Sequence, residues 1–312
     1  MIAPVRVRRP ASGTPAARFS GPDLADLRPG QSLELLQELH ILTVDGRINQ
    51  DSRRKLKQVN HLYGFIEKIL LELSSTATVS QVSPGVAATA AGLTVADHGA
   101  GKSYLGFILY DLFFRSRATG WIYGVETRLE LVQKSQFLAA RLGFERMTFF
   151  PLRVCEAAAS DEMPAHIDLV TALHACDTAT DDAIAFGLRK KARFMVLVPC
   201  CQAELARMLN ASKALSLRKT PLAELWRHPL HTRELGSQLS NVLRCLYLEA
   251  CGYEVTVTEL VGWEHSMKNE LILARHSGKC NVVAGTRLRA LLEQFGLQEL
   301  LQTRYQWLAQ PH

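Results

Sequence analysis

The sequence predicts an α/β fold, in which a seven-stranded, mostly parallel sheet with an antiparallel last strand follows an N-terminal helical segment. Two observations support this prediction. From about residue 81, short runs rich in Val, Ile and Leu alternate with helix-like segments, which is typical of a parallel sheet with helices on both faces. The last two strand-like runs, 253–260 and 270–276, follow each other without a helix and should form a hairpin.

Residues 1–30 are expected to form a flexible basic arm. They hold five arginines against two aspartates, which is half of the chain's net charge of +6, and few large apolar side chains. The same composition resembles an organelle transit peptide. A targeting segment, an RNA-binding arm and a solvated tail therefore stay open as alternatives.

Residues 31–80 are predicted to be a helical accessory segment. Residues 31–44 look like a short helix that runs into an extended stretch. In the following helix, Arg53, Arg54 and Lys57 occupy the first turns, where the helix dipole disfavours cations. They are candidates for contacts to substrate phosphates, and a solvated basic end is the alternative. One face of this helix should be buried, because apolar residues recur every three or four positions: Leu56, Val59, Leu62, Ile66, Ile69 and Leu73.

Residues 81–312 are expected to form the main domain. Helices are predicted at 104–117, between the strand at 120–126 and about residue 142, at 236–251 and near 286–301. The predicted strands are 93–97, 120–126, 147–152, 167–173, 194–199, 253–260 and 270–276.

The stretch ADHGAGKS, residues 96–103, follows the first predicted strand and fits two kinds of site. As a nucleotide-triphosphate loop it offers Gly101, Lys102 and Ser103. However, Ala96 stands where that motif normally has glycine, and neither Asp168 nor Asp177 is well placed to bind magnesium. The triphosphate site is therefore the weaker interpretation.

As a cofactor loop, the same stretch offers Asp97 and glycines at 99 and 101. The glycines let the backbone turn tightly beside a ligand, and the next helix points its free amides at the same place. Glu126 ends the second predicted strand. Its two carboxylate oxygens match the vicinal hydroxyls of a ribose, which favours a nucleoside cofactor.

Four segments together resemble a known family. ADHGAGKSYLG, YGVET, TALHACDTATDDA and LVPCCQ, in this order, are similar to the class I S-adenosylmethionine-dependent methyltransferases, which have a Rossmann-like seven-stranded sheet. More narrowly, they resemble a subfamily with D-x-G-x-G-K-x-x-L, L-H-x-C and P-C-C motifs that includes RNA methyltransferase-like domains. The resemblance covers roughly residues 50–276 and implies S-adenosyl-L-methionine as the cofactor.

The resemblance also implies which residues contact the cofactor. Ser103 stands where a glycine is common in the family, and its side chain is expected to cap the following helix. The implied contacts are Asp97, Gly99, Ala100 and Gly101 along the methionine and ribose, Glu126 on the ribose hydroxyls, Cys155, Glu156 and Ala157 over the adenine, and His174 after the fourth strand.

Methyl transfer from a sulfonium mainly needs donor and acceptor in line, and a base only where the acceptor must lose a proton. The (Asp/Asn)-Pro-Pro-aromatic motif of amino-directed enzymes is absent, which argues against exocyclic amines as acceptors. Cytosine-C5 chemistry through Cys176 and Cys200, a metal held with His174, and packing roles for the cysteines are the alternatives. The candidate catalytic residues after strands four and five are His174, Cys176, Asp177, Cys200 and Cys201.

The connection between the last two strands carries further candidates for substrate binding. Trp263, His265, Lys268 and Asn269 combine an aromatic ring with a cation, which suits a base and a phosphate. A purely structural role in the turn is the alternative. With the basic helix start, these residues favour RNA as the substrate. A protein or small-molecule acceptor, and a scaffold that binds the cofactor without turnover, are the other hypotheses.

Targeting signals and metal motifs set further expectations. No apolar run approaches the roughly 20 residues that span a bilayer, and the N-terminus lacks a secretory apolar core. A cytoplasmic protein with free thiols and no membrane partner is therefore expected. No CxxC or His-x3-His spacing is present, so no structural metal site is predicted.

Overall fold

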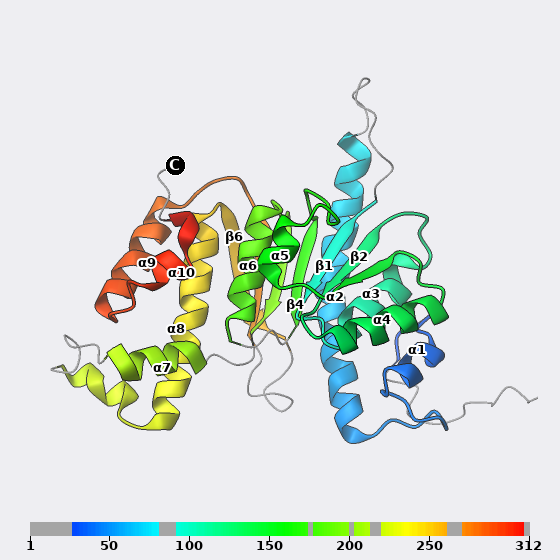
Figure 1. The fold of residues 1–312 in the computed structure, drawn as a ribbon, viewed down its shortest axis with the longest axis horizontal. Helices are drawn as coiled ribbons and strands as arrows, with labels where there is room; N and C mark the ends of the chain where they lie inside the picture. Colours follow the sequence, from blue (N-terminus) through cyan, green and yellow to red (C-terminus); the bar gives the residue numbers. More distant parts are fainter. Residues whose placement is uncertain are drawn as a thin grey trace, which may run out of the picture.

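The computed structural model describes residues 27–80, 92–173, 177–199, 203–212, 220–260 and 270–308. Its strands are β1 (Thr94–His98), β2 (Trp121–Val125), β3 (Met147–Phe150), β4 (Leu169–Leu173), β5 (Phe194–Val198), β6 (Tyr253–Glu259) and β7 (Glu270–His276). They form one sheet in the order β3-β2-β1-β4-β5-β7-β6 (Figure 1). Only β7 runs antiparallel to its neighbours in this sheet. The predicted Rossmann-like fold class is therefore confirmed.

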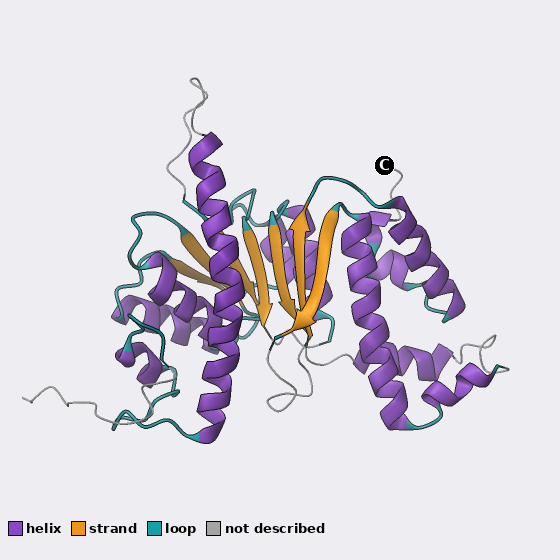
Figure 2. Ribbon diagram, turned by 180° about the vertical axis from the view of Figure 1, so that it is seen from behind, coloured by secondary structure: helices purple, strands orange, loops and turns teal. Residues whose placement is uncertain are grey.

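Helices cover both faces of this sheet. Figure 1 looks onto the face that carries α5 and α6, and Figure 2 shows α2 crossing the opposite face. The helices are α1 (Leu33–Glu38), α2 (Gln50–Ser80), α3 (Tyr104–Leu109), α4 (Leu129–Arg141), α5 (Val154–Ala159), α6 (Ala179–Arg189), α7 (Ala203–Ser212), α8 (Pro229–Ala250), α9 (Val282–Gln294) and α10 (Leu300–Thr303). Shorter turns are the π-helix η2 (Tyr110–Phe114) and the 3-10 helices η4 (Pro221–Trp226) and η5 (Gln306–Leu308).

The core consists of two hydrophobic clusters, one on each face of the sheet. Side chains of α1 to α4 form one cluster, and side chains of α5 to α10 form the other. Val95 of β1 belongs to the first cluster and Ala96 to the second. Because both faces of β1 are covered, all five of its residues are buried, including the polar Thr94, Asp97 and His98.

The long helix α2 buries the stripe that the sequence predicts. Leu56, Leu62, Ile66 and Leu73 are each at most 1% exposed, and Ile69 is partly buried against the same cluster. This burial fixes how the helix is rotated on the sheet. Its polar first turns remain at the surface.

Two predicted helices differ from the structure because local contacts end them. The segment predicted as one helix at 104–117 ends as η2, where the Arg146 guanidinium binds the carbonyl oxygens of Phe114 and Arg117 at 2.9 and 2.7 Å. The helix predicted near 286–301 corresponds to α9, which ends at Gln294. Gly296 follows with a φ of +65°, a backbone conformation that ends helices.

Two further boundaries were also predicted incorrectly. α8 begins at Pro229 rather than near residue 236, and proline at a first helical position was a readable signal. The stretch expected to be extended after α1 forms turns instead, with His40 at a φ of +56°. Among the described residues, no helix has the length and apolar character needed to cross a membrane.

Candidate functional site

The loop after β1 is folded back against the end of β2. Gly99 and Gly101 have φ values of +62° and +57°, which glycine adopts without strain. The amides of Gly99 and Ala100 donate to the carbonyl oxygen of Val125 at 3.0 and 3.3 Å. The loop therefore lies at the carboxyl edge of the sheet, where open parallel sheets bind ligands.

Asp97 is a buried carboxylate beneath this loop. Its side chain accepts a hydrogen bond from the Thr171 hydroxyl at 2.9 Å, and the residue is only 2% exposed. Burial raises the pKa of Asp97 to about 6, although bonds from Thr171, Ser103 and the Gly106 amide partly offset this. Keeping an ionised carboxylate here costs folding free energy, which is typical of a functional position. Thr171, which fixes the carboxylate from β4, was not identified from the sequence.

Ser103 does not cap α3 as the sequence suggested. It occupies the N-cap position, but with a φ of 51° its side chain makes no capping bond. The hydroxyl instead donates to Asp97 at 3.5 Å, in a fully buried position. The left-handed backbone turns the hydroxyl away from the helix amides and toward the carboxylate.

Glu126 stands at the end of β2 and accepts hydrogen bonds with both oxygens. Its Oε2 accepts from the Gly101 amide at 2.8 Å, which connects the two strand-end segments. The Arg128 guanidinium binds both oxygens, at 3.0 and 3.1 Å. Burial acts to raise the pKa of Glu126, but the bonds from Arg128 and Gly101 outweigh it and lower the pKa. Glu126 is therefore an ionised acceptor at neutral pH.

The Arg128 guanidinium competes with a ribose for the Glu126 carboxylate. Its side chain is 61% exposed, while that of Glu126 is 8% exposed. A ribose diol that binds Glu126 must replace the two guanidinium bonds, and the exposed arginine has space outside the site. The glycine loop and the ionised acceptor otherwise fit a nucleoside with a cationic sulfonium. The role of Arg128 was not identified from the sequence.

His98 is buried beside the same loop. It is 1% exposed and lies edge-on to Phe186 of α6, with ring centroids 4.2 Å apart. Neither ring nitrogen has a hydrogen-bond partner in the part of the chain that the structure describes. Burial lowers the pKa of His98 to about 3, so the ring is neutral.

The predicted adenine loop is only partly placed. Ala157 is fully buried within the second cluster, and Glu156 is exposed. The Glu156 carboxylate accepts from the Arg153 amide at 2.8 Å and closes the first turn of α5. The structure does not describe the Cys155 side chain.

Among the candidate catalytic residues, the structure describes Asp177. Its two carboxylate oxygens accept from the Glu204 amide at 2.9 Å and from Arg207 at 3.0 Å, so it connects the loop after β4 to the start of α7. In the described ranges, no group of three His, Cys, Asp or Glu side chains could hold a metal ion. Outside those ranges lie His174, Cys176, Cys200 and Cys201.

The candidate substrate-binding residues on α2 lie in its first turns. Arg54 and Lys57 are exposed and Arg53 is half-buried. Arg54 forms a loose ion pair with Asp51 at 3.7 Å, with both side chains more than half exposed. The other candidates lie outside the described residues: Trp263, His265, Lys268 and Asn269.

The triphosphate interpretation does not fit this geometry. Asp97 and Glu126 both lie at the loop, where they would repel phosphates. Asp168 lies at the opposite edge of the sheet, where it accepts bonds from the Thr94 amide and hydroxyl at 2.9 and 3.0 Å. It holds the amino ends of β1 and β4 together and cannot reach a magnesium ion at the loop.

Comparisons with known proteins agree with the cofactor interpretation. A family model described as a methyltransferase domain matches residues 54–208, which include β1 to β5 and the glycine loop. No curated protein matches the chain.

The solved structures that the chain matches include several methyltransferases. The fibrillarin pre-rRNA processing protein of Methanococcus jannaschii is 11% identical, with 60% of this chain and 67% of that chain covered and a TM-score of 0.37. Aeropyrum pernix fibrillarin with natively bound S-adenosyl-L-methionine is 14% identical, with 59% and 66% covered and a TM-score of 0.34. Magnesium protoporphyrin IX methyltransferase of Synechocystis with bound SAH is 14% identical, with 78% and 95% covered and a TM-score of 0.40.

Proposed function

We propose that the chain is a class I S-adenosylmethionine-dependent methyltransferase and that its methyl acceptor is RNA. The observation that carries this proposal is the place of the basic start of α2. Figure 2 shows the first turns of α2 projecting beyond the sheet on the side of the carboxyl ends of the parallel strands. Cations placed there can hold the phosphates of a substrate whose base reaches the cofactor loop.

The charges of this helix start are suited to phosphate contacts. Residues 51–57 hold Arg53, Arg54, Lys55 and Lys57 against the single acid Asp51, a net charge of +3. A helix N-terminus normally favours acids, so helix stability does not explain these cations. A polyanionic substrate explains both their sign and their position.

The residues at the loop would hold the cofactor. S-adenosyl-L-methionine supplies a methyl group activated by a sulfonium. We assign Glu126 to the ribose hydroxyls, with the glycine backbone of 99–101 and Asp97 beside the methionine part. Arg128 withdraws from Glu126 when the ribose binds. The chain's own contribution is to hold the donor in one orientation at the carboxyl edge of the sheet.

We assign the acceptor side of the site to the residues that follow β4 and β5. In the sequence, these strands are followed by His174, Cys176, Cys200 and Cys201. One of them serves as a base where the acceptor must lose a proton. Asp177, the first described residue after β4, contacts Glu204 and Arg207 of α7.

Transfer of labelled methyl groups from S-adenosyl-L-methionine to total cellular RNA tests the proposal. The parent should label RNA, and the Arg53→Ala/Arg54→Ala/Lys57→Ala variant should label it less and bind it more weakly. On single strands, each lost phosphate contact lowers the salt dependence of log K by about 0.7, so three contacts lower it by about 2.

A matched control removes the same charge elsewhere. Lys68, Lys279 and Arg287 are exposed and lie outside the first turns of α2, and their triple alanine variant should behave as the parent. If the parent binds the cofactor but labels protein or small molecules and not RNA, the RNA proposal is wrong. Equal RNA binding by the two triple variants would also contradict it.

A further inference from the structure

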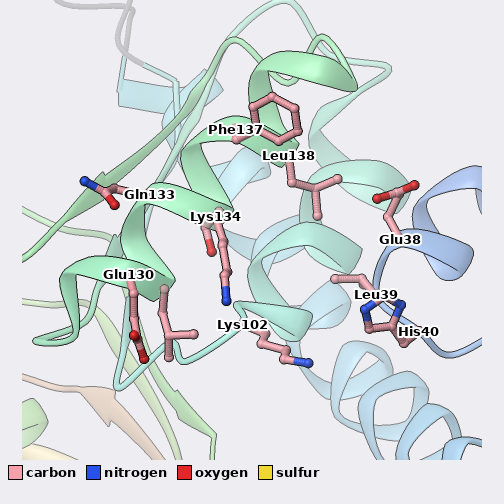
Figure 3. Close-up of a pocket in the computed structure, with 11 residues that line it drawn as sticks. Glu38, Leu39, His40, Lys102, Glu130, Gln133, Lys134, Phe137 and Leu138 are labelled. Atoms are coloured by element: carbon pink, nitrogen blue, oxygen red, sulfur yellow. The ribbon is translucent and has the colours of Figure 1, made fainter.

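We propose that a pocket between α4 and the end of α1 binds a nucleotide that flanks the methylated position of the RNA. This inference rests on the proposed RNA substrate. The pocket has a volume of about 540 Å³, within the range of small-molecule sites. Its walls come from Leu39 and His40 after α1, from Lys102 of the glycine loop and from the outer face of α4 (Figure 3).

The pocket is lined by two cations, Lys102 and Lys134. In Figure 3, Lys102 and Lys134 extend into the space between α4 and the end of α1. Neither forms an ion pair within the described part of the chain. Two acids also line the pocket: Glu38 forms an ion pair with Arg141, and Glu130 offsets one of the two lysine charges. The remaining positive charge suits a phosphate.

An aromatic side chain lies at the rim of the same pocket. Phe137 is 68% exposed, although it is a large apolar side chain on a helix whose other face is buried. Leu131 and Leu138, both half-buried, continue the apolar surface inward. A base that stacks on Phe137 would cover this surface while its phosphate contacts the lysines, and such stacking does not depend on base identity.

The pocket connects the cofactor loop to the basic start of α2. On one side, Lys102 directly follows Gly101, whose amide binds Glu126. On the other side, the carbonyl oxygen of His40 accepts a bond from the Ser52 hydroxyl of α2 at 3.4 Å. An RNA strand that contacts the first turns of α2 therefore passes the pocket on its way to the cofactor loop. The occupant is consequently a nucleotide of the substrate rather than a separate effector.

Two single variants and two controls test this site by binding of a single-stranded oligonucleotide. Phe137→Ala should weaken binding about five-fold or more, and Phe137→Trp should retain it, because tryptophan also stacks. Lys134→Ala should weaken binding and lower the salt dependence by about 0.7. Lys68→Ala, which removes an exposed cation of α2 outside the pocket, should match the parent.

Two further measurements separate this inference from the proposed function. Affinity for S-adenosyl-L-methionine should be unchanged in Phe137→Ala, because the side chain is not part of the cofactor loop. Crosslinking of an oligonucleotide that contains 4-thiouridine should label a peptide that includes residue 137. If the parent binds the oligonucleotide but Phe137→Ala and Lys134→Ala bind it equally well, the pocket assignment is wrong while the RNA proposal stands. Adenosine monophosphate binding that is lost in Phe137→Ala, with unchanged oligonucleotide binding, would also overturn it.

Discussion

Replacing Asp97 by asparagine should make the fold more stable at neutral pH and weaken cofactor binding. The side chain is 2% exposed, and burial raises its pKa from 3.8 to about 6. Each unit of pKa corresponds to 1.36 kcal/mol, so ionised Asp97 costs roughly 3 kcal/mol of folding free energy. Asparagine has nearly the same shape, carries no charge and retains an oxygen that accepts from Thr171, but its amide nitrogen cannot accept from the Gly106 amide, so the gain in stability stays below this value.

The pH dependence follows from the direction of this shift. The folded state holds the proton of Asp97 between about pH 4 and pH 6, where the unfolded chain has already lost it. Stability contributed by the protonated form is present below the unfolded pKa and is lost as the pH rises through the folded pKa. Relative to Asp97→Asn, the parent should therefore lose about 2–3 kcal/mol between pH 4 and pH 7.

Urea unfolding of both proteins at pH 4, 5, 6 and 7 measures this difference. The comparison removes the titration of all other groups, because they are shared. Calorimetry with S-adenosyl-L-methionine at pH 7 provides the second reading, in which the more stable variant should bind more weakly. A stability difference that stays constant with pH, or that favours the parent as the pH rises, would show that burial does not raise the pKa of Asp97.

Three further variants test the ion pairs of the structure. Glu126→Ala should weaken S-adenosyl-L-methionine binding by about 1–3 kcal/mol in calorimetry, and unchanged affinity would remove it from the site. Arg128→Ala should tighten cofactor binding up to about five-fold at low salt, because an ion pair whose arginine is largely exposed contributes about 1 kcal/mol; weaker binding would make Arg128 a ligand. Arg244→Ala should cost about 3–5 kcal/mol in urea unfolding, because it leaves Asp181 (paired at 2.6 Å) without its partner. Arg244→Met/Asp181→Asn should recover much of that loss.

The alternation of apolar strand-like runs with helix-like segments along the sequence was sufficient to predict the strands of the sheet. All seven strands lie within about two residues of their predicted bounds, because apolar runs that are buried on both faces are hard to mistake. The buried stripe of α2 was predicted correctly for the same reason. The boundary errors arise where a few tertiary hydrogen bonds determine the end of a helix. An example is the end of η2, where Arg146 binds two carbonyl oxygens.

The site was harder to predict than the fold. The motif identified Asp97, the glycines and Glu126 as strand-end groups, but it carried no information on side-chain direction. The Ser103 hydroxyl turns to Asp97 because of a left-handed backbone that serine rarely adopts. Arg128 contacts Glu126, two residues earlier in the sequence, and this spacing alone does not predict an ion pair. Phe137 and Lys134 meet residues of α1 only through the fold, almost a hundred positions apart in sequence.

Calorimetric titration with S-adenosyl-L-methionine and with ATP, on the parent and on Glu126→Ala, tests the central claim most directly. The site combines a buried Asp97 with an ionised Glu126, so it should bind the sulfonium cofactor and exclude a triphosphate. We expect saturable S-adenosyl-L-methionine binding that weakens in Glu126→Ala, and no ATP binding with or without magnesium. Tight ATP binding with no response to S-adenosyl-L-methionine would contradict the account.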